Sequence, residues 1–263
     1  MDNIIRAKKS LGQNFLKDPY YLKKIVDVAR LGPEDLVLEI GPGLGHLTRL
    51  LALQARKVLA LEIDERLIPL LRQEFSMLHN VEIVHADANE YPYEILLDRW
   101  KVVANLPYNI ATPIIQRLIV CRHKFATLTL MLQQEVAERL AALPGGREYG
   151  YLSVLVQLYA EPNIDFIVPP GAFTPKPEVT SAVITLKMRD HPAVKVLDEG
   201  FFVRVVKAAF SQRRKTLKNA LKQLDVPVEK MAIVLDKTGI DLRRRAETLT
   251  VKEFGLLADH LSS

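Results

Sequence analysis

LVLEIGPGLG, at residues 36–45, decides the fold, because an apolar run there leads into three closely spaced glycines. Leu47, Leu50 and Leu51 then recur at helical spacing, which predicts a strand, a glycine turn and a helix in succession. Since glycine has no Cβ, such a turn lets the backbone approach a nucleotide-like ligand closely. The spacing is G-x-G-x-G rather than the G-x-G-x-x-G of dinucleotide-binding proteins, and an ordinary turn would have the same sequence.

Polar residues follow the next three expected strands. The second strand ends in Glu62, which lies 21 residues after Gly41, the distance at which a carboxylate usually binds a ribose diol. The third strand leads to Asp87 and the fourth to Asn105. Ligands of open α/β sheets bind at the carboxyl ends of the strands. These residues are therefore expected to converge on one site for a nucleoside-like ligand.

The fourth strand ends in the corner NLPY at residues 105–108. Pro107 stops strand pairing and holds the backbone at a fixed φ. The Asn105 side-chain oxygen and a main-chain carbonyl can each accept one hydrogen from an exocyclic amine, and Tyr108 can stack on a flat ring. The corner therefore suits a ring that carries an –NH₂ group, although four residues alone also fit a simple strand end and turn.

Taken in order, the motifs resemble those of the ribosomal RNA adenine N6-dimethyltransferase family. They are SLGQNFL at 10–16, the glycine loop with Glu62 and Asp87, NLPY at 105–108, AFTPKP at 172–177 and AFSQRRKTL at 209–217. The resemblance covers nearly the whole chain and is nearest to the branch that dimethylates two adjacent adenosines near the 3′ end of small-subunit (16S) rRNA. It implies a cytoplasmic, monomeric enzyme that acts on ribosomal RNA within a precursor of the small ribosomal subunit.

The resemblance also implies site residues and S-adenosylmethionine as cofactor. The cofactor would be bound by Asn14, Leu16, Gly41, Gly43, Gly45, Glu62, Asp87 and Asn105. The catalytic residues would be Asn105, Leu106, Pro107, Tyr108 and Phe173, with Tyr108 and Phe173 on either side of the target base. From the sequence alone, Phe173 fits equally well as a core aromatic that anchors a proline loop. No metal site is expected, since the single cysteine, Cys121, excludes a cysteine-based zinc cluster and an internal disulfide.

Two domains are expected. Strands and helices alternate over residues 36–133, which predicts an α/β fold with a doubly wound, Rossmann-like methyltransferase sheet, closed by strands at 164–168 and 182–187. His191-Pro192 marks the boundary between a catalytic domain at 1–190 and a smaller helical RNA-binding domain at 191–263. No apolar run is long enough to span a bilayer, so no membrane is expected as a partner.

The net charge of +5 lies entirely in residues 195–263, which hold 14 Lys and Arg against 9 Asp and Glu. A single helix is expected there, with apolar residues from Phe210 to Leu224 on one face and cations repeating every four residues on another. This surface is predicted to bind RNA, although a solvated helix face would show the same pattern. The RNA-binding residues would be Arg213, Arg214, Lys215, Lys218 and Lys222.

Several alternatives share some of these features. A large-subunit (23S) rRNA adenine N6-methyltransferase of the macrolide-resistance type would carry the same catalytic motifs. A non-catalytic rRNA-binding assembly factor would retain the fold but would often lose motif residues. A DNA adenine methyltransferase would more often carry an acid in place of Asn105, and the glycine spacing disfavours a nicotinamide dehydrogenase.

Overall fold

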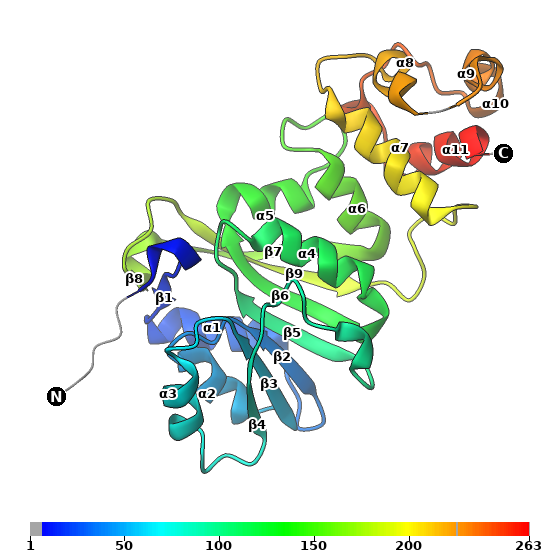
Figure 1. Cartoon of the computed structure of the whole chain (residues 1–263). Helices are drawn as coiled ribbons and strands as arrows, with labels where there is room; N and C mark the ends of the chain where they lie inside the picture. Colours follow the sequence, from blue (N-terminus) through cyan, green and yellow to red (C-terminus); the bar gives the residue numbers. More distant parts are fainter. Residues whose placement is uncertain (1–6, 225, 263) are drawn as a thin grey trace. The chain divides into compact units, whose positions relative to one another are not determined.

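The computed structural model describes residues 7–224 and 226–262 and contains a seven-stranded sheet with the strand order β4-β3-β2-β5-β6-β9-β7 (Figure 1). Neighbouring strands from β4 to β6 pair in parallel, and β9 pairs with β6 in the antiparallel direction. The strands are β2 (Leu36–Ile40), β3 (Lys57–Glu62), β4 (Val81–His85), β5 (Trp100–Asn105), β6 (Phe125–Gln133), β7 (Ala160–Val168) and β9 (Ser181–Met188). The expected alternation and the closing strand pair are confirmed.

One helix precedes β2 and others alternate with the parallel strands, but only a 3-10 turn lies between β4 and β5. The helices are α1 (Pro19–Ala29), α2 (His46–Ala52), α3 (Ile68–Glu74), α4 (Ala111–Val120) and α5 (Gln134–Ala141), with short 3-10 turns at Tyr93–Ile95 and Arg122–Lys124. Asp18 caps helix α1 by accepting a hydrogen bond from the Tyr20 amide, and Pro19 supplies a suitable φ for its first turn. Within the two described ranges, no helix is both long and apolar enough to cross a bilayer.

Burial on both faces of the sheet explains its apolar strands. Val37, Val58 and Val103 lie in one core cluster with the apolar side of α1 and α2. Side chains alternate along a strand, so Leu38 and Val102 point to the opposite face, where both are 0% exposed. Such two-sided burial is typical of parallel sheets, and it fixes the carboxyl ends of the strands as a rigid edge.

A second, two-stranded sheet joins two motifs that are far apart in the sequence. Strand β1 (Phe15–Leu16) pairs antiparallel with β8 (Phe173–Thr174), so that Leu16 lies opposite Phe173. The amide of Lys17 extends the pairing by donating to the Ala172 carbonyl at 3.0 Å. Short 3-10 turns at Lys9–Leu11 and Pro170–Ala172 precede the two strands. The segment at 10–16 is thereby tied to the proline-rich loop at 169–177.

The chain divides into two compact units, Met1–Ala137 with Asn163–Met188, and Glu138–Pro162 with Arg189–Ser263. The break between Met188 and Arg189 lies close to the expected boundary after residue 190. The second unit, however, also includes Glu138–Pro162 and thus α6 (Tyr151–Tyr159). There α6 packs with α7 (Glu199–Ser211) and α11 (Val251–Ser262), and the ring of Phe210 lies 6.0 Å from that of Tyr149 and 5.7 Å from that of Phe254. This aromatic packing explains why α6 belongs to the C-terminal unit.

The expectation of a continuous helix through residues 210–224 is wrong. Helix α7 ends at Ser211, and the chain resumes as α8 (Leu217–Ala220) and a 3-10 turn at Leu221–Gln223. The amides of Leu217 and Lys218 donate to the Arg244 and Leu242 carbonyls, at 2.9 and 3.0 Å, so tertiary hydrogen bonds replace helical continuation. Arg214 therefore lies in the connecting turn and does not share a helix face with Lys218. The remaining elements are α9 (Val228–Ala232), α10 (Val234–Thr238) and a 3-10 turn at Ala246–Thr248.

Candidate active site

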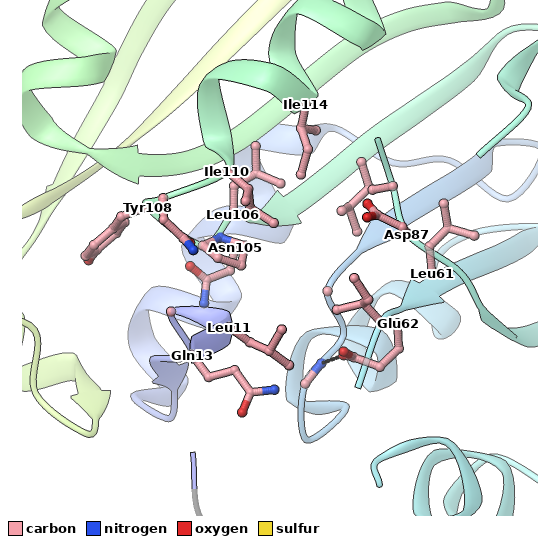
Figure 2. Close-up of a pocket in the computed structure, with 18 of the residues that line it drawn as sticks. Leu11, Gln13, Leu61, Glu62, Asp87, Asn105, Leu106, Tyr108, Ile110 and Ile114 are labelled. Atoms are coloured by element: carbon pink, nitrogen blue, oxygen red, sulfur yellow. Dashed lines mark hydrogen bonds between the residues drawn. The ribbon is translucent and has the colours of Figure 1, made fainter. Parts of the chain in front are cut away.

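A pocket lies at the carboxyl ends of the parallel strands, where the sequence predicts it (Figure 2). The N-terminal segment at 10–15 forms one wall, and residues 105–110 form another. Nine of the predicted residues line this pocket: Asn14, Gly41, Gly43, Glu62, Asp87, Asn105, Leu106, Pro107 and Tyr108. Leu16, Gly45 and Phe173 do not line it.

The glycine loop bends sharply between β2 and α2, and its glycines adopt positive φ. Gly43 has a φ of 57°, and a Cβ there would lie 2.9 Å from the Phe15 ring, so glycine lets the loop pack under the N-terminal segment. Gly45 has a φ of 77°, and a Cβ there would lie 2.8 Å from the Phe75 ring. Gly45 therefore serves the packing of α2 against α3 and stays outside the pocket.

Glu62 is 3% exposed, and its carboxylate is held by two backbone amides. One oxygen accepts from Gly43 at 3.1 Å and the other from Asp64 at 2.9 Å. Burial raises the pKa of Glu62, while these two hydrogen bonds oppose that shift. Each carboxylate oxygen has a second lone pair, which can accept from a hydroxyl group in the pocket. Asp87 lies on the same pocket, and its side chain accepts from the Asn89 amide at 2.8 Å.

Asp64 and Gln13 attach the N-terminal segment to the pocket. The Gln13 amide donates to the Asp64 carboxylate at 2.9 Å, and Asp64 is paired with the Arg66 guanidinium at 2.6 Å. Hydrogen bonding to Arg66 holds the pKa of Asp64 well below its usual range, so the carboxylate stays charged. The contact joins positions 51 residues apart, and the sequence gives no signal for it.

The Asn105 amide is oriented by a single hydrogen bond. Its Nδ2 donates to the main-chain carbonyl of Asn14 at 3.0 Å, which determines which end of the amide is the oxygen. Among the described residues no donor is bonded to Oδ1, which is left to accept a hydrogen from a ligand. The corner itself is held because the Leu106 amide donates to the Met131 carbonyl of β6 at 3.1 Å.

The two aromatic residues expected to enclose a base lie in different environments. Tyr108 is half-buried on the pocket, and its hydroxyl lies 2.8 Å from that of Ser181. Phe173 is 4% exposed and packs in the hydrophobic core beside Leu16, which is 6% exposed. The structure thus brings Tyr108 but not Phe173 to the pocket, and the position of Phe173 fits the core aromatic that anchors the proline loop.

Glu39 was missed by sequence analysis, although an acid inside an apolar strand is itself a signal. It is 1% exposed beneath the glycine loop, and within the described ranges its Oε2 has no hydrogen-bond partner. Burial raises the pKa of Glu39 to about 8. A small cavity next to the main pocket is lined by Glu39, Leu16, Gly43, His46 and Asn105, among others.

Most of the predicted RNA-binding cations are exposed on the C-terminal unit. In the part of the chain that the structure describes, Arg214, Lys215, Lys218 and Lys222 form no ion pair. Arg213 differs, because it donates to the carbonyls of Arg147 and Tyr149 and lies 3.7 Å from the Glu247 carboxylate. Its contacts lie within the C-terminal unit, so Arg213 differs in environment from the other four cations.

The pocket fits a nucleoside that carries a sulfonium. The loop glycines allow close approach of backbone, Glu62 presents oriented acceptors for a diol, and Leu61, Leu106 and Ile114 supply apolar walls. The sheet and its pocket are those of a Rossmann-like, S-adenosylmethionine-dependent methyltransferase, as predicted.

The chain belongs to the ribosomal RNA adenine dimethylase family, whose model matches residues 4–262. A ribosomal RNA small subunit methyltransferase A from Geobacter metallireducens is 48% identical over 97% of this chain and 95% of its own length. The protein of the same name from Clostridium botulinum is 45% identical, over 97% of this chain and 94% of its own length.

Solved structures agree with this assignment. A dimethyladenosine transferase from Plasmodium falciparum matches with a TM-score of 0.81 and 28% identity, covering 92% of this chain and 95% of its own. The 23S rRNA methyltransferase ErmE matches with a TM-score of 0.74 and 28% identity, covering 95% of this chain and all of its own. The fold class and the family expected from the sequence are therefore confirmed.

Proposed function

We propose that the protein transfers methyl groups from S-adenosylmethionine to the N6 amines of two adjacent adenosines near the 3′ end of small-subunit rRNA. The observation that carries this proposal is the Asn105 amide, whose Nδ2 is bonded to the Asn14 carbonyl so that Oδ1 is available to a substrate amine. Relatives that are 45–48% identical over nearly the whole chain carry the name small subunit methyltransferase.

The chain's residues would act mainly by positioning the amine. An adenine amine is a poor nucleophile because its lone pair is delocalised into the ring. If Asn105 Oδ1 and a main-chain carbonyl of the Leu106–Pro107 corner each accept one N–H hydrogen, the nitrogen becomes pyramidal and its lone pair is localised. When bound, S-adenosylmethionine supplies an electrophilic methyl group. Alignment of the two reactants can supply much of the rate. As the nitrogen–methyl bond forms, the sulfur–methyl bond would break and the neutral thioether would leave. The methylated nitrogen would then carry an extra, acidic proton, which water can accept without a general base at the corner.

Tyr108 would provide the face on which the target base stacks. A base must leave its own helix or stack to reach such a pocket, which costs a few kcal/mol. Stacking on an aromatic side chain returns about 1–3 kcal/mol per base. Phe173 could form the opposite face only after β8 moves, since its ring is packed in the core.

The cofactor would be held by residues on the ends of the parallel strands. Glu62 would accept hydrogen bonds from the ribose hydroxyls, and Asp87 would accept one from the adenine amine of the cofactor. The loop at Gly41 and Gly43 would approach the cofactor through its backbone, and Asn14 would close the site from the N-terminal segment. The buried Glu39 lies beneath this loop, beside the same site.

The C-terminal unit would bind RNA phosphates through its exposed cations. Residues 191–263 are proposed as the core of this RNA-binding domain, because the excess of positive charge lies there. We further propose that the enzyme works as a monomer in the cytoplasm on a precursor of the small ribosomal subunit. The domain's packing with Glu138–Pro162 supports a rigid surface for that partner.

The main alternative is methylation of large-subunit rRNA, which is suggested by the structural similarity to the 23S rRNA methyltransferase ErmE. That match has 28% identity, whereas the small-subunit relatives reach 48%, so the small-subunit assignment has more support. A non-catalytic assembly factor is less well supported, because the pocket retains Glu62, Asp87, Asn105 and Tyr108 together.

Transfer of a labelled methyl group to purified ribosomal subunits separates these functions. The full-length protein would be incubated with labelled S-adenosylmethionine and either small or large subunits that lack the methyl groups. We expect label in small-subunit RNA only. Label in large-subunit RNA would favour the alternative, and binding without any transfer would favour the assembly factor.

A further inference from the structure

The hydroxyl of Tyr108 makes a contact that the proposed reaction does not yet explain. Tyr108 lies on the pocket wall, and Figure 2 shows its ring extending from the corner to the side away from Glu62 and Asp87. Its hydroxyl is 2.8 Å from the Oγ of Ser181, a residue that is 0% exposed and begins β9. Within the described part of the chain, neither hydroxyl has another hydrogen-bond partner.

Ser181 is a rigid anchor because the backbone around it is paired. It lies opposite Gln133 in the antiparallel pairing of β9 with β6, and the adjacent Thr180 carbonyl accepts from the Gln134 amide at 3.0 Å. The corner that carries Tyr108 is fixed to the same strand end, since the Leu106 amide donates to the Met131 carbonyl. The backbone that carries Tyr108 and the residue that contacts its hydroxyl are thus both hydrogen-bonded to the end of β6.

A tyrosine ring attached only at Cα can rotate about two torsions. Here the hydroxyl at the far end is also held, which fixes the direction of the ring axis and thereby the first torsion. Burial raises the pKa of Tyr108, which keeps the phenol neutral and its hydrogen available for the contact with Ser181. A ring held at one place beside the corner is what a stacking face for one particular base requires.

We infer that Ser181 is a positioning residue for methyl transfer, because its hydroxyl holds the Tyr108 ring at the place where the target adenine stacks. The inference rests on the proposed stacking role of Tyr108. Ser181 is fully buried and does not line the pocket, so it would act through Tyr108 rather than by touching the substrate.

Single-turnover methylation of small-subunit RNA, with RNA and S-adenosylmethionine saturating, tests this role. Ser181→Ala is expected to slow the transfer about three- to tenfold, the rate equivalent of one neutral hydrogen bond. Tyr108→Phe removes the same bond from the other side and should slow it by a similar factor. The double variant should be no slower than either single variant, because both remove one interaction. The Kd for S-adenosylmethionine should stay unchanged in all three.

Two further variants separate positioning from general damage to the sheet. Thr129→Val removes another buried hydroxyl of the same sheet, one without a hydrogen-bond partner among the described residues, and should leave the rate unchanged. Ser181→Thr retains the hydroxyl and should restore most of the rate. With 2-aminopurine at the target position of the RNA, stacking quenches fluorescence in the wild type, and Ser181→Ala should reduce that quenching.

Each result decides the inference. A wild-type rate in Ser181→Ala, or rate losses that multiply in the double variant, would overturn it. If Ser181→Ala does not fold, a wild-type rate in Tyr108→Phe would overturn the inference instead. A wild-type rate in Tyr108→Ala would remove the stacking role and the inference together. Loss of rate in Tyr108→Ala without loss in Ser181→Ala overturns only the inference, whereas a wild-type enzyme that methylates no small-subunit RNA contradicts the proposed function itself.

Discussion

At the scale of single residues, the Asn105 amide shows how one hydrogen bond selects the chemistry of a site. Its Nδ2 is bonded to the Asn14 carbonyl, and Oδ1 is thereby left for an amine. We expect Asn105→Ala to lower kcat about 100-fold or more, the range for loss of one oriented transition-state contact. RNA affinity should change little, because one contact is small within a phosphate interface. Single-turnover rates and RNA titrations of the same variant check this, and a near-normal rate would exclude the role.

Glu62 should matter for binding more than for the chemical step. Glu62→Ala is expected to weaken S-adenosylmethionine binding by about 1.5–3 kcal/mol, because hydrogen bonds to a charged group are lost. Glu65→Ala removes the same charge from an exposed position three residues further on and serves as the control. Calorimetric titration with S-adenosylmethionine measures both. Equal affinities in the two variants would remove Glu62 from the cofactor site.

Three of the predicted residues lie at the end of a strand or just after it. Glu62, Asp87 and Asn105 converge because parallel strands end at one edge of the sheet, and this can be predicted from local pattern. Ser181 could not be found in this way, because its contact with Tyr108 joins positions 73 residues apart. Phe173 has a motif but lies in the core, since pairing of β8 with β1 turns it away from the pocket lining.

At the scale of elements, the glycine loop has two requirements that can be separated experimentally: a positive φ and, at some positions, the absence of a Cβ atom. Gly41 and Gly45 have similar φ values, 71° and 77°. A Cβ on Gly41 would meet only the Asn105 carbonyl oxygen at 3.9 Å, whereas one on Gly45 would lie 2.8 Å from the Phe75 ring. Gly41→Ala should therefore cost about 1–2 kcal/mol for the backbone alone. Gly45→Ala should cost a further 1–3 kcal/mol or so for crowding.

Denaturant unfolding followed by the fluorescence of Trp100 measures this difference. Trp100 is the only tryptophan, and it is buried in the same unit as both glycines. Equal stabilities of the two variants would show that Phe75 yields without cost, and that α2 and α3 are not held together at this point.

Glu39, in strand β2, makes the stability of the folded protein depend on pH. Burial raises its pKa to about 8 in the folded protein, from the ordinary value of 4.5 for a glutamate. Between these pH values the unfolded chain releases a proton that the folded protein retains. The contribution of Glu39 to the free energy of unfolding is therefore greatest below about pH 4.5 and is lost as the pH rises to about 8.

We expect the free energy of unfolding of the free protein to fall more steeply between pH 5 and 8 than that of Glu39→Gln. The difference in slope should be up to about 1.4 kcal/mol per pH unit. Glu34→Gln, at a position whose side chain is 87% exposed, should keep the wild-type slope. Parallel curves for wild type and Glu39→Gln would mean that Glu39 is ionised in the folded protein.

Elements built from local signals were predicted well, and the exception is instructive. Most strands of the large sheet coincide with apolar runs, and α6 coincides with an apolar run of helical length, so these elements could be predicted from their own residues. Strand β7 begins at Ala160, four residues before the expected start, and this was missed because its first half is polar. The break at 212–216 could not, because the amides that begin α8 bond to carbonyls at 242–244. Helical periodicity continues through the break in the sequence, but tertiary hydrogen bonding decides the backbone.

At the scale of the whole molecule, the concentration of positive charge predicts where RNA binds. Replacing Arg214, Lys218 and Lys222 by Gln should flatten the slope of log K against log salt by up to about 2–3, since each lost phosphate contact contributes about 0.7–0.9. S-adenosylmethionine affinity should be unchanged. A control with Gln at Lys23, Arg56 and Lys187, which are exposed on the other unit, should keep most of the slope. Equal slopes for the wild type and the first triple variant would show that Arg214, Lys218 and Lys222 do not contact RNA phosphates and only face solvent.

The central claim is that this protein dimethylates adjacent adenosines of small-subunit rRNA. The most direct test is mass mapping of small-subunit rRNA after incubation of unmethylated subunits with the full-length protein and isotopically labelled S-adenosylmethionine. We expect two labelled methyl groups on each of two adjacent adenosines near the 3′ end, and their loss with Asn105→Ala. Label on another base, on the ribose or only in large-subunit RNA would contradict it.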